Sequence, residues 1–376
     1  MLIQCTKKLL DQLGIKPETQ EEEEPLFSWH AHLITLNRRK TLVLVNDKNR
    51  YVVVLHGLKA KDFKNLDEIV LQGIRKTLIE EGITEEVIDK YLLHSKEVTY
   101  TKTKDRTSVA RMNKACEYVY FLEELLENDS IFNTRMSMRV SRFLMGDGKN
   151  KYILPNEELY KDLEVFAGKP IFMMNAVQLK VTLRLEKGHV WRRILVPINK
   201  TFNNLHDILQ AAFGWRNYHL HEFYIYNSET SGHVLSKNHS AYHQEGYKPV
   251  INLVCNEEAF AYPNEVDMKL DTDIELSEYI PAYKSLKYNY DFGDNWQHDV
   301  EVEKVIDNYH ANYPVCLKGE GNTPPEDVGG NYGFEEFLKI LADPLHPDHK
   351  YMVEWGRIQG YKNFDIEGVN RLLKDI

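Results

Sequence analysis

Apolar and polar positions alternate early in the chain and then change to a helical period. Short runs rich in β-branched residues, separated by turn residues, predict a β-meander at 31–37, 41–47 and 50–58. Between 62 and 94 apolar residues recur three and four positions apart, as on one face of an amphipathic helix. The first part of the chain is therefore predicted to hold strands followed by helices.

A second set of strands begins directly after the Gly–Lys–Pro turn at 168–170. The elements predicted there are a hairpin at 177–197, a helix ending at Gly214, strands at 219–227 and 249–255, a hairpin at 288–305, and helices at 333–343 and 365–376. Strands and helices mixed without a strict βαβ rhythm indicate an α+β fold. We predict two domains, 1–168 and 172–376, each a mostly antiparallel sheet packed with helices.

A chain of 376 residues, 43% of them hydrophobic, is long enough for two buried cores. No run approaches the roughly 20 consecutive apolar residues that a membrane span needs, and the first residues lack the features of a signal peptide. We therefore expect a cytoplasmic protein with no membrane partner. The four cysteines are far apart and form no Cys-x-x-Cys pair, so we expect buried thiols and no disulfide framework.

The net charge of −10 is unevenly distributed along the chain. Residues 1–170 hold 27 basic and 27 acidic side chains, whereas residues 171–376 hold 20 and 30. Because nucleic-acid affinity depends on neutralising phosphates, the acidic second half is a poor candidate for such binding. In the first half, the basic run of Arg38, Arg39 and Lys40 is a candidate nucleic-acid contact, or simply a solvated turn.

The stretch "YNYDFGDNWQHDVEVEKV" at 288–305 places polar residues inside a hairpin pattern. One interpretation is structural: Asp291 and Asp294 cap the turn and His298 is a hydrogen-bonded core histidine. The other is functional, with Asp294 as a catalytic carboxylate and Trp296 as a binding residue. Both interpretations predict the same local pattern of strands.

The functional interpretation needs partners, and "HLHEF" supplies two histidines. His219 and His221 are two apart on a predicted strand, so they are expected to share a face. Together with His298 and Asp291 from the hairpin they would form a metal site of imidazole and carboxylate ligands, which suits zinc, manganese or iron. The alternative is that these histidines lie at the polar rim of a core.

Two other blocks carry candidate functional residues. "TPPEDVGGNYG" delivers Glu326 and Asp327 ahead of a helix, where they are candidate catalytic or cation-binding carboxylates, or acids that favour the helix dipole. "VWRRIL" places Arg192 and Arg193 on opposite faces of a strand, as candidate binding residues. The arginine on the covered face is expected to need an acidic partner, such as an acid of the "DFGD" block.

The chain resembles known families in both halves. The second half is similar to the plasmid pRiA4b ORF-3-like family through the ordered blocks "VWRRILVP", "TFNNLHDILQAAFGW", "HLHEF", "YDFGDNWQHDVEVEK", "YPVCLKGEGNTPPEDVGG" and "VNRLL". The first half, with "QCTKKLL" and "FSWHAHLITLNRRK", resembles a small family of uncharacterised bacterial domains found ahead of ORF-3-like domains. The resemblance implies an association with plasmids and transposons, and it implies no particular activity.

Three functions follow from these observations. The first is a mobile-element-associated binding or accessory protein that presents a polar cleft to an unidentified protein or small molecule. The second is a metal-dependent hydrolase of a phosphoester or similar bond, with the three histidines as ligands and Asp294 or Glu326 as base. The third is nucleic-acid binding by the first domain. Clustering of the "HLHEF", "DFGDNWQH" and "PPED" blocks around one concave pocket would favour the enzyme, whereas their dispersal into separate cores would favour a scaffold.

Overall fold

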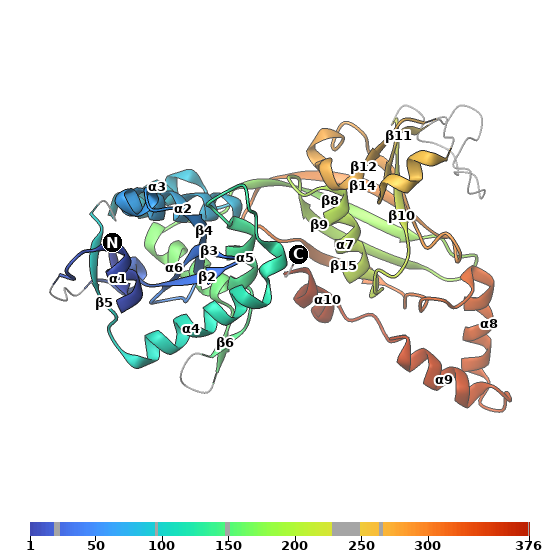
Figure 1. The fold of residues 1–376 in the computed structure, drawn as a ribbon. Coiled ribbons are helices and arrows are strands. Elements are labelled where there is room, and N and C mark those ends of the chain that lie inside the picture. Colours follow the sequence, from blue (N-terminus) through green and yellow to red (C-terminus); the bar gives the residue numbers. More distant parts are fainter. Residues whose placement is uncertain (19–22, 95–96, 147–150, 228–248, 263–265, 375) are drawn as a thin grey trace. The chain divides into compact units, whose positions relative to one another are not determined.

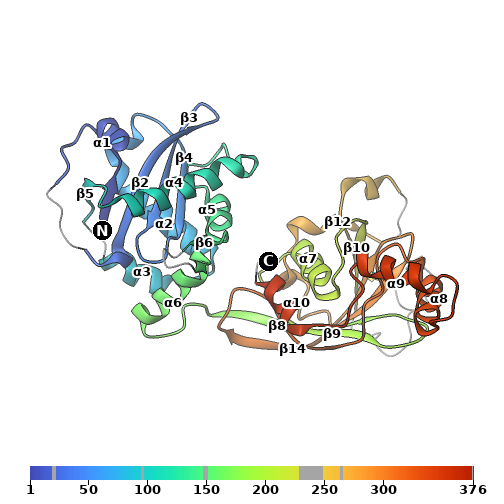
Figure 2. The same cartoon turned by 90° about the horizontal axis from the view of Figure 1, so that it is seen from below.

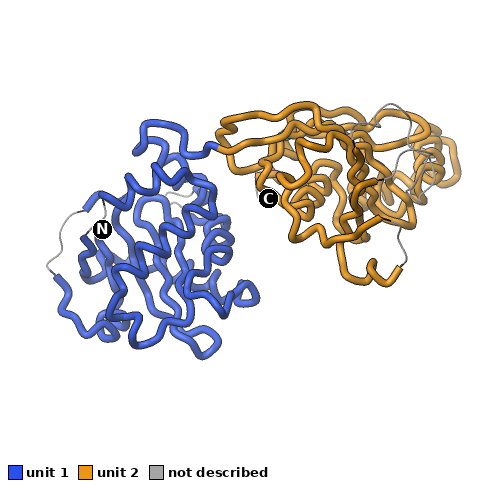
Figure 3. Tube along the Cα trace, turned by 90° about the horizontal axis from the view of Figure 1, so that it is seen from above, with its two compact units in different colours: residues 1–173 blue, residues 174–376 orange. Residues whose placement is uncertain are grey.

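The protein has two compact units, residues 1–173 and residues 174–376 (Figure 3). The computed structural model describes the whole chain apart from residues 19–22, 95–96, 147–150, 228–248, 263–265 and 375 (Figure 1). Each unit contains a sheet packed with helices, which confirms the predicted α+β class.

Unit 1 has a mixed sheet of five strands. Their order across the sheet is β4 (Val52–Leu58), β3 (Arg39–Asn46), β2 (Ser28–Leu36), β1 (Leu2–Cys5) and β5 (Thr99–Lys102). The predicted meander is confirmed, since β2, β3 and β4 pair antiparallel in succession. The strand β1 runs parallel to both of its neighbours, so this sheet is not mostly antiparallel.

Helices cover both faces of this sheet (Figure 1). They are α1 (Lys7–Leu13), α2 (Leu66–Glu80), α3 (Glu85–His94), α4 (Arg106–Phe121), α5 (Thr134–Ser141) and α6 (Pro155–Ala167), and a small ribbon pairs β6 (Met145–Gly146) with β7 (Tyr152–Ile153). Alternate residues of β3 contribute to two separate cores, Leu42 and Leu44 to one, and Val43 and Val45 to the other. A strand that is buried on both faces reads as a continuous apolar run, as "TLVLV" does.

Unit 2 has an eight-stranded sheet. Its order is β12 (Met268–Leu270), β11 (Pro249–Val254), β10 (His221–Tyr226), β13 (Ser285–Tyr290), β14 (Trp296–Tyr309), β8 (Met174–Leu183), β9 (Val190–Pro197) and β15 (Val315–Glu320). Every neighbouring pair is antiparallel except β11 and β12. The predicted hairpin at 288–305 is therefore confirmed and lies in the middle of the sheet.

The helix α7 (Phe202–Phe213) packs on one face of this sheet. Its start is fixed by a capping box, in which the backbone nitrogen of Asn204 donates to the Thr201 hydroxyl and the backbone nitrogen of Thr201 donates to Asn204 Oδ1. Its end is fixed by Gly214 at φ 78°. The apolar side of α7 lies in the main core, and α10 (Ile366–Leu373) lies on the same side of the sheet (Figure 2). The helices α8 (Gly330–Ala342) and α9 (His349–Ile358) complete the unit.

Arg192, in the middle of β9, connects three segments of unit 2. Its guanidinium donates to the carbonyl oxygens of Trp191, Ala212, Glu320 and Gly321 and to the Thr323 hydroxyl, at 2.8 to 3.2 Å. The side chain is 2% exposed, and burial lowers its pKa to about 10. The end of α7, the end of β15 and the start of the 323–329 loop are thereby held together.

The prediction that the inward-facing arginine, which is Arg192, has an acidic partner is wrong. All five N–H groups of Arg192 bind neutral oxygens, which requires no carboxylate. It is the outward Arg193 that forms a bidentate pair, at 2.7 Å to both carboxylate oxygens of Glu303 on β14. That bond lowers the pKa of Glu303 to about 2.

We expect Arg192→Met to lower the free energy of unfolding of unit 2 by about 3–5 kcal/mol, because the buried carbonyls that it binds lose their donors. The adjacent Arg193→Met is the matched control and should change it by at most about 1 kcal/mol, since its pair lies at the surface. Urea unfolding of the full chain, followed by tryptophan fluorescence, measures both. Equal losses in the two variants would contradict the proposed role of Arg192.

Candidate functional site

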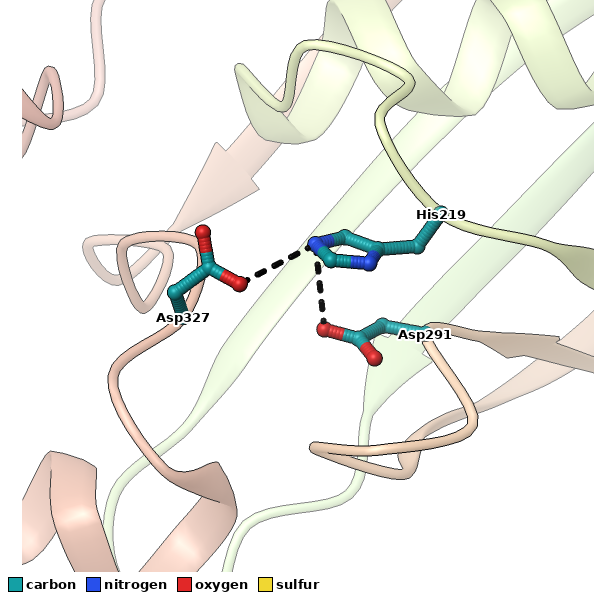
Figure 4. A group of neighbouring side chains, drawn as sticks. All are labelled: His219, Asp291 and Asp327. Atoms are coloured by element: carbon teal, nitrogen blue, oxygen red, sulfur yellow. Dashed lines mark ion pairs between the residues drawn. The ribbon is translucent and has the colours of Figure 1, made fainter.

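Side chains from three loops of unit 2 converge on one point (Figure 4). His219 precedes β10, Asp291 follows β13, and Asp327 precedes α8. The His219 Nε2 atom lies 3.5 Å from Asp291 Oδ2 and 3.3 Å from Asp327 Oδ1. One ligand atom from each residue lies within 4.8 Å of the others. We call these three residues the His–Asp–Asp cluster.

The conformation of Asp291 is fixed by its own turn. Its backbone has φ 55°, a left-handed conformation that aspartate tolerates better than most residues. The Oδ1 atom accepts hydrogen bonds from the backbone nitrogens of Gly293 and Asp294, at 2.9 and 3.2 Å. The other oxygen, Oδ2, therefore remains directed toward His219.

The Gly329–Gly330 pair brings the 323–329 loop against the hairpin turn. Asp294 Oδ2 accepts a hydrogen bond from the Gly329 nitrogen at 3.2 Å. Gly330 has φ 64°, and a Cβ atom there would lie 2.8 Å from the Asp294 carbonyl oxygen. Only glycine fits this approach without strain. The helix α8 begins at Gly330, three residues before its predicted start at 333.

A buried hydrogen bond joins the two loops that carry His219 and Asp327. The Tyr290 hydroxyl donates to Glu326 Oε1 at 2.5 Å and accepts a hydrogen bond from the Tyr218 nitrogen at 3.1 Å. The same Glu326 oxygen accepts from the Arg216 nitrogen at 3.1 Å. Burial and the Glu326 carboxylate raise the pKa of Tyr290. Glu326, proposed from sequence as a base, is thus 4% exposed and already bonded.

The two aspartates of the cluster, Asp291 and Asp327, lie near a third, Asp294, so negative charge is concentrated here. Burial raises the pKa of Asp294, and the neighbouring Asp291 and Asp327 carboxylates raise it further. In the described part of the chain, no lysine or arginine forms an ion pair with any of these three aspartates. A divalent cation at this point would compensate their charge.

Two of the three separations between the ligand atoms match the spacing of metal ligands. Ligand bonds of about 2.1 Å in a tetrahedral arrangement place neighbouring ligand atoms about 3.4 Å apart, and the two distances from His219 Nε2 are 3.3 and 3.5 Å. That nitrogen is sealed from solvent and has no hydrogen-bond partner among the described residues. One imidazole and two carboxylates suit zinc, manganese or iron.

The structure does not bring His221 and His298 to this cluster. The strand β10 begins at His221, so His219 lies in the preceding loop and the two histidines do not share a strand face. His221 Nε2 lies 2.7 Å from Asp271 Oδ2 in the core. His298 is fully buried on β14, and its Nδ1 bonds the Tyr288 carbonyl oxygen at 3.2 Å. Both therefore have structural partners of their own.

A buried histidine pair was not anticipated from the sequence. The rings of His206 and His221 stack with centroids 3.5 Å apart. Burial and the neighbouring His221 lower the pKa of His206 to about 3, and burial lowers the pKa of His298 to about 3. In the sequence, His206 is one polar residue in a predicted helix, and Asp271, the partner of His221, lies in a segment without a motif. The sequence pattern therefore gives no sign that His206 and His221 stack.

None of the remaining candidate binding residues belongs to the cluster. Trp296 is fully buried and stacks on Trp215, with ring centroids 6.2 Å apart. In unit 1, Arg38 occupies the β2–β3 turn with φ 62°. Arg39 donates to the Asn128 carbonyl oxygen at 2.9 Å, and Lys40 to Gln12 Oε1 at 2.5 Å. Two of the three cations of this basic run are thus bound within unit 1.

The fold and the cluster define a two-unit α+β protein whose C-terminal unit carries the His–Asp–Asp cluster. Residues 175–372 match the family model described as plasmid pRiA4b ORF-3-like protein, and the chain belongs to this family. Residues 2–158 match a domain of unknown function, DUF6933. Both predicted resemblances are confirmed. Among the described residues, no helix is both long and apolar enough to cross a membrane.

Two relatives align with about half of the chain. The uncharacterized protein y4hQ of Sinorhizobium fredii (strain NBRC 101917 / NGR234) is 33% identical over 202 residues, which are 52% of this chain and 87% of the relative. The crystal structure of the protein of unknown function MM3350 from Methanosarcina mazei Go1 is 32% identical, covers 48% of this chain and 89% of its own, and has a TM-score of 0.38.

The depressed histidine pKa values predict a pH dependence of stability. Because the folded-state pKa of His206 and His298 is about 3, below the unfolded value of about 6.5, the unfolded chain binds protons first. Their contribution is complete above pH 6.5 and is lost as the pH falls toward 3. Within that window each histidine adds a slope of about 1.4 kcal/mol per pH unit.

We expect His298→Gln to reduce the slope of the unfolding free energy against pH by about 1.4 kcal/mol per pH unit between pH 6 and 4, which corresponds to one proton. The exposed His189→Gln is the control and should leave the slope unchanged. Urea unfolding at a series of pH values measures it. An unaltered slope in His298→Gln would show that His298 is not held neutral by burial.

Proposed function

We propose that the C-terminal unit is a divalent-metal-dependent hydrolase of a phosphoester or similar bond, with His219, Asp291 and Asp327 as the metal ligands. The observation that carries this proposal is the spacing of the His–Asp–Asp cluster. The separations of 3.3 and 3.5 Å from His219 Nε2 to the two carboxylate oxygens are close to the roughly 3.4 Å between neighbouring ligands of a tetrahedral site. The candidate metals are zinc, manganese and iron.

Three protein ligands leave a coordination position for water. A metal in such a site lowers the pKa of its bound water and polarises the oxygen of a bound ester. Asp294 follows Asp291 by three residues, and its carboxylate, whose pKa burial raises, is the candidate general base. Tyr290 and Glu326 position the two loops that carry His219 and Asp327.

The convergence of three sequence blocks supports a hydrolase over a binding or accessory protein. "HLHEF" contributes His219, "DFGDNWQH" contributes Asp291 and Asp294, and "PPED" contributes Asp327. All of these residues lie in loops that flank strand or helix ends, where catalytic residues are commonly found. A protein that only presents a surface to a partner does not require three loops to meet at one buried imidazole nitrogen.

Metal content is the direct test of the ligand set. We expect protein purified without a histidine tag, then dialysed against zinc, manganese or iron(II), to retain close to one ion per chain by plasma mass spectrometry. His219→Ala and Asp327→Asn should lose it, whereas His189→Ala, at an exposed histidine of the same unit, should not. The site would be refuted if all variants retained the metal ion, or if the unmodified protein took up none.

Activity separates the hydrolase from a metal-binding protein without catalysis. We expect metal-loaded protein to hydrolyse bis(4-nitrophenyl) phosphate, and Asp294→Asn to reduce kcat by about 100-fold or more while the metal content is unchanged. Unimpaired turnover in Asp294→Asn would exclude this aspartate as the base. Full metal occupancy without hydrolysis would leave metal binding intact and exclude phosphoester hydrolysis.

A further inference from the structure

Unit 2 contains a cavity of about 310 Å³ that the proposed metal site does not use. It lies between the end of α7, the start of the 323–329 loop, the 359–365 segment and α10. Its volume is at the lower end of the range of small-molecule sites. Its lining includes Arg192 and Thr323, and Lys362 and Phe364 from the 359–365 segment.

The cavity wall carries a buried positive charge without an acidic partner. The guanidinium of Arg192 lies between the rings of Phe364 and Phe213, 3.9 and 5.1 Å from their centroids. Its hydrogen bonds go to neutral oxygens only, so its charge is not neutralised by the protein. A cation in this position favours an anion over a neutral molecule in the adjacent cavity.

The acids in the cavity wall are already bonded. Glu326 accepts hydrogen bonds from Tyr290 and from the Arg216 nitrogen. Asp365 caps α10 by accepting from the Glu367 nitrogen at 3.1 Å, and it lies 3.7 Å from Arg371. The cavity wall as a whole carries three basic side chains, Arg192, Lys362 and Arg371, against the two acids Glu326 and Asp365.

Two groups of the wall remain able to donate. The Thr323 hydroxyl oxygen accepts from Arg192, and its own hydrogen has no acceptor among the described residues. Lys362 is exposed at the rim, and its ammonium group has no partner in the described part of the chain. A hydroxyl and an ammonium beside a buried guanidinium form a set that binds a carboxylate or a phosphate.

The rest of the wall is aromatic. The rings of Phe213 and Trp215 are nearly parallel, at 19°, with centroids 5.6 Å apart, and Trp215 is held by a hydrogen bond from its indole nitrogen to the Pro324 carbonyl oxygen at 3.0 Å. Together with Phe364 they offer flat apolar surface beside the cationic groups. Flat walls of this kind pack well against a planar ring.

From this combination we infer that the cavity binds a small aromatic anion, with its ring against Phe213, Trp215 and Phe364 and its carboxylate or phosphate group near Thr323 and Lys362. This site goes beyond the proposed hydrolase function and does not depend on a bound metal. The two sites share one loop, since Glu326 lines the cavity and the next residue, Asp327, belongs to the His–Asp–Asp cluster.

The test uses full-length protein treated with a chelator and three probes: benzoate, phenylphosphonate and the neutral benzyl alcohol. None of the three is a substrate for ester hydrolysis. We expect calorimetric titration to give binding of at least one anion at submillimolar Kd, with benzyl alcohol at least tenfold weaker. Equal binding of anionic and neutral probes, or binding of none, would overturn the proposal.

Variants locate the bound anion. Thr323→Val and Lys362→Ala should each weaken binding of the anion about tenfold, whereas Lys350→Ala, at an exposed lysine on α9, should leave it unchanged. His219→Ala should also leave it unchanged, which separates this site from the metal site. Because Lys362 is exposed, its variant remains informative even if Thr323→Val fails to fold. Binding that none of these variants alters would place the anion elsewhere and refute the assignment.

Discussion

The buried guanidinium of Arg192 is the interaction on which the rest of unit 2 depends. It binds the last turn of α7, the end of β15 and Thr323, three segments that no other single side chain described here connects. Burial of a cation is unfavourable unless its donors are fully bonded. Because carbonyl oxygens satisfy the donors but leave the charge, the same side chain both fixes the 323–329 loop and adds a positive charge to the wall of the adjacent cavity.

The geometry of the His–Asp–Asp cluster depends on the position of the 323–329 loop. Thr323 anchors the loop at one end, and the Gly329–Gly330 contact with Asp294 anchors it at the other. Between these anchors, Glu326 bonds to Tyr290 and so aligns the loop with the residue before Asp291. A site built on loops reaches useful precision only when such supporting bonds hold the loops to strands.

The sequence was sufficient for the large features and insufficient for particular side-chain partners. Period-two alternation at 288–305 predicts β13 and β14, because one face of that hairpin is aromatic or aliphatic except for His298. The same rule placed His219 and His221 on one face, and it failed because it assumes that both residues lie in the strand, whereas β10 begins at His221. The carbonyl partners of Arg192 and the pairing of His221 with Asp271 depend on tertiary contacts that no local pattern encodes.

Two of the three cluster residues have left-handed backbones, Asp291 at φ 55° and Asp327 at φ 60°. Such conformations are uncommon outside glycine, and they persist where the surrounding structure imposes them. Asp291 gains two hydrogen bonds from its own turn in return, but the described structure gives the Asp327 carboxylate only the His219 contact. Strain and carboxylate repulsion at one point both disfavour the folded form. If the cluster holds a cation as proposed, that cation would relieve the repulsion and bind the folded form in preference to the unfolded chain, which would couple metal binding to the stability of unit 2.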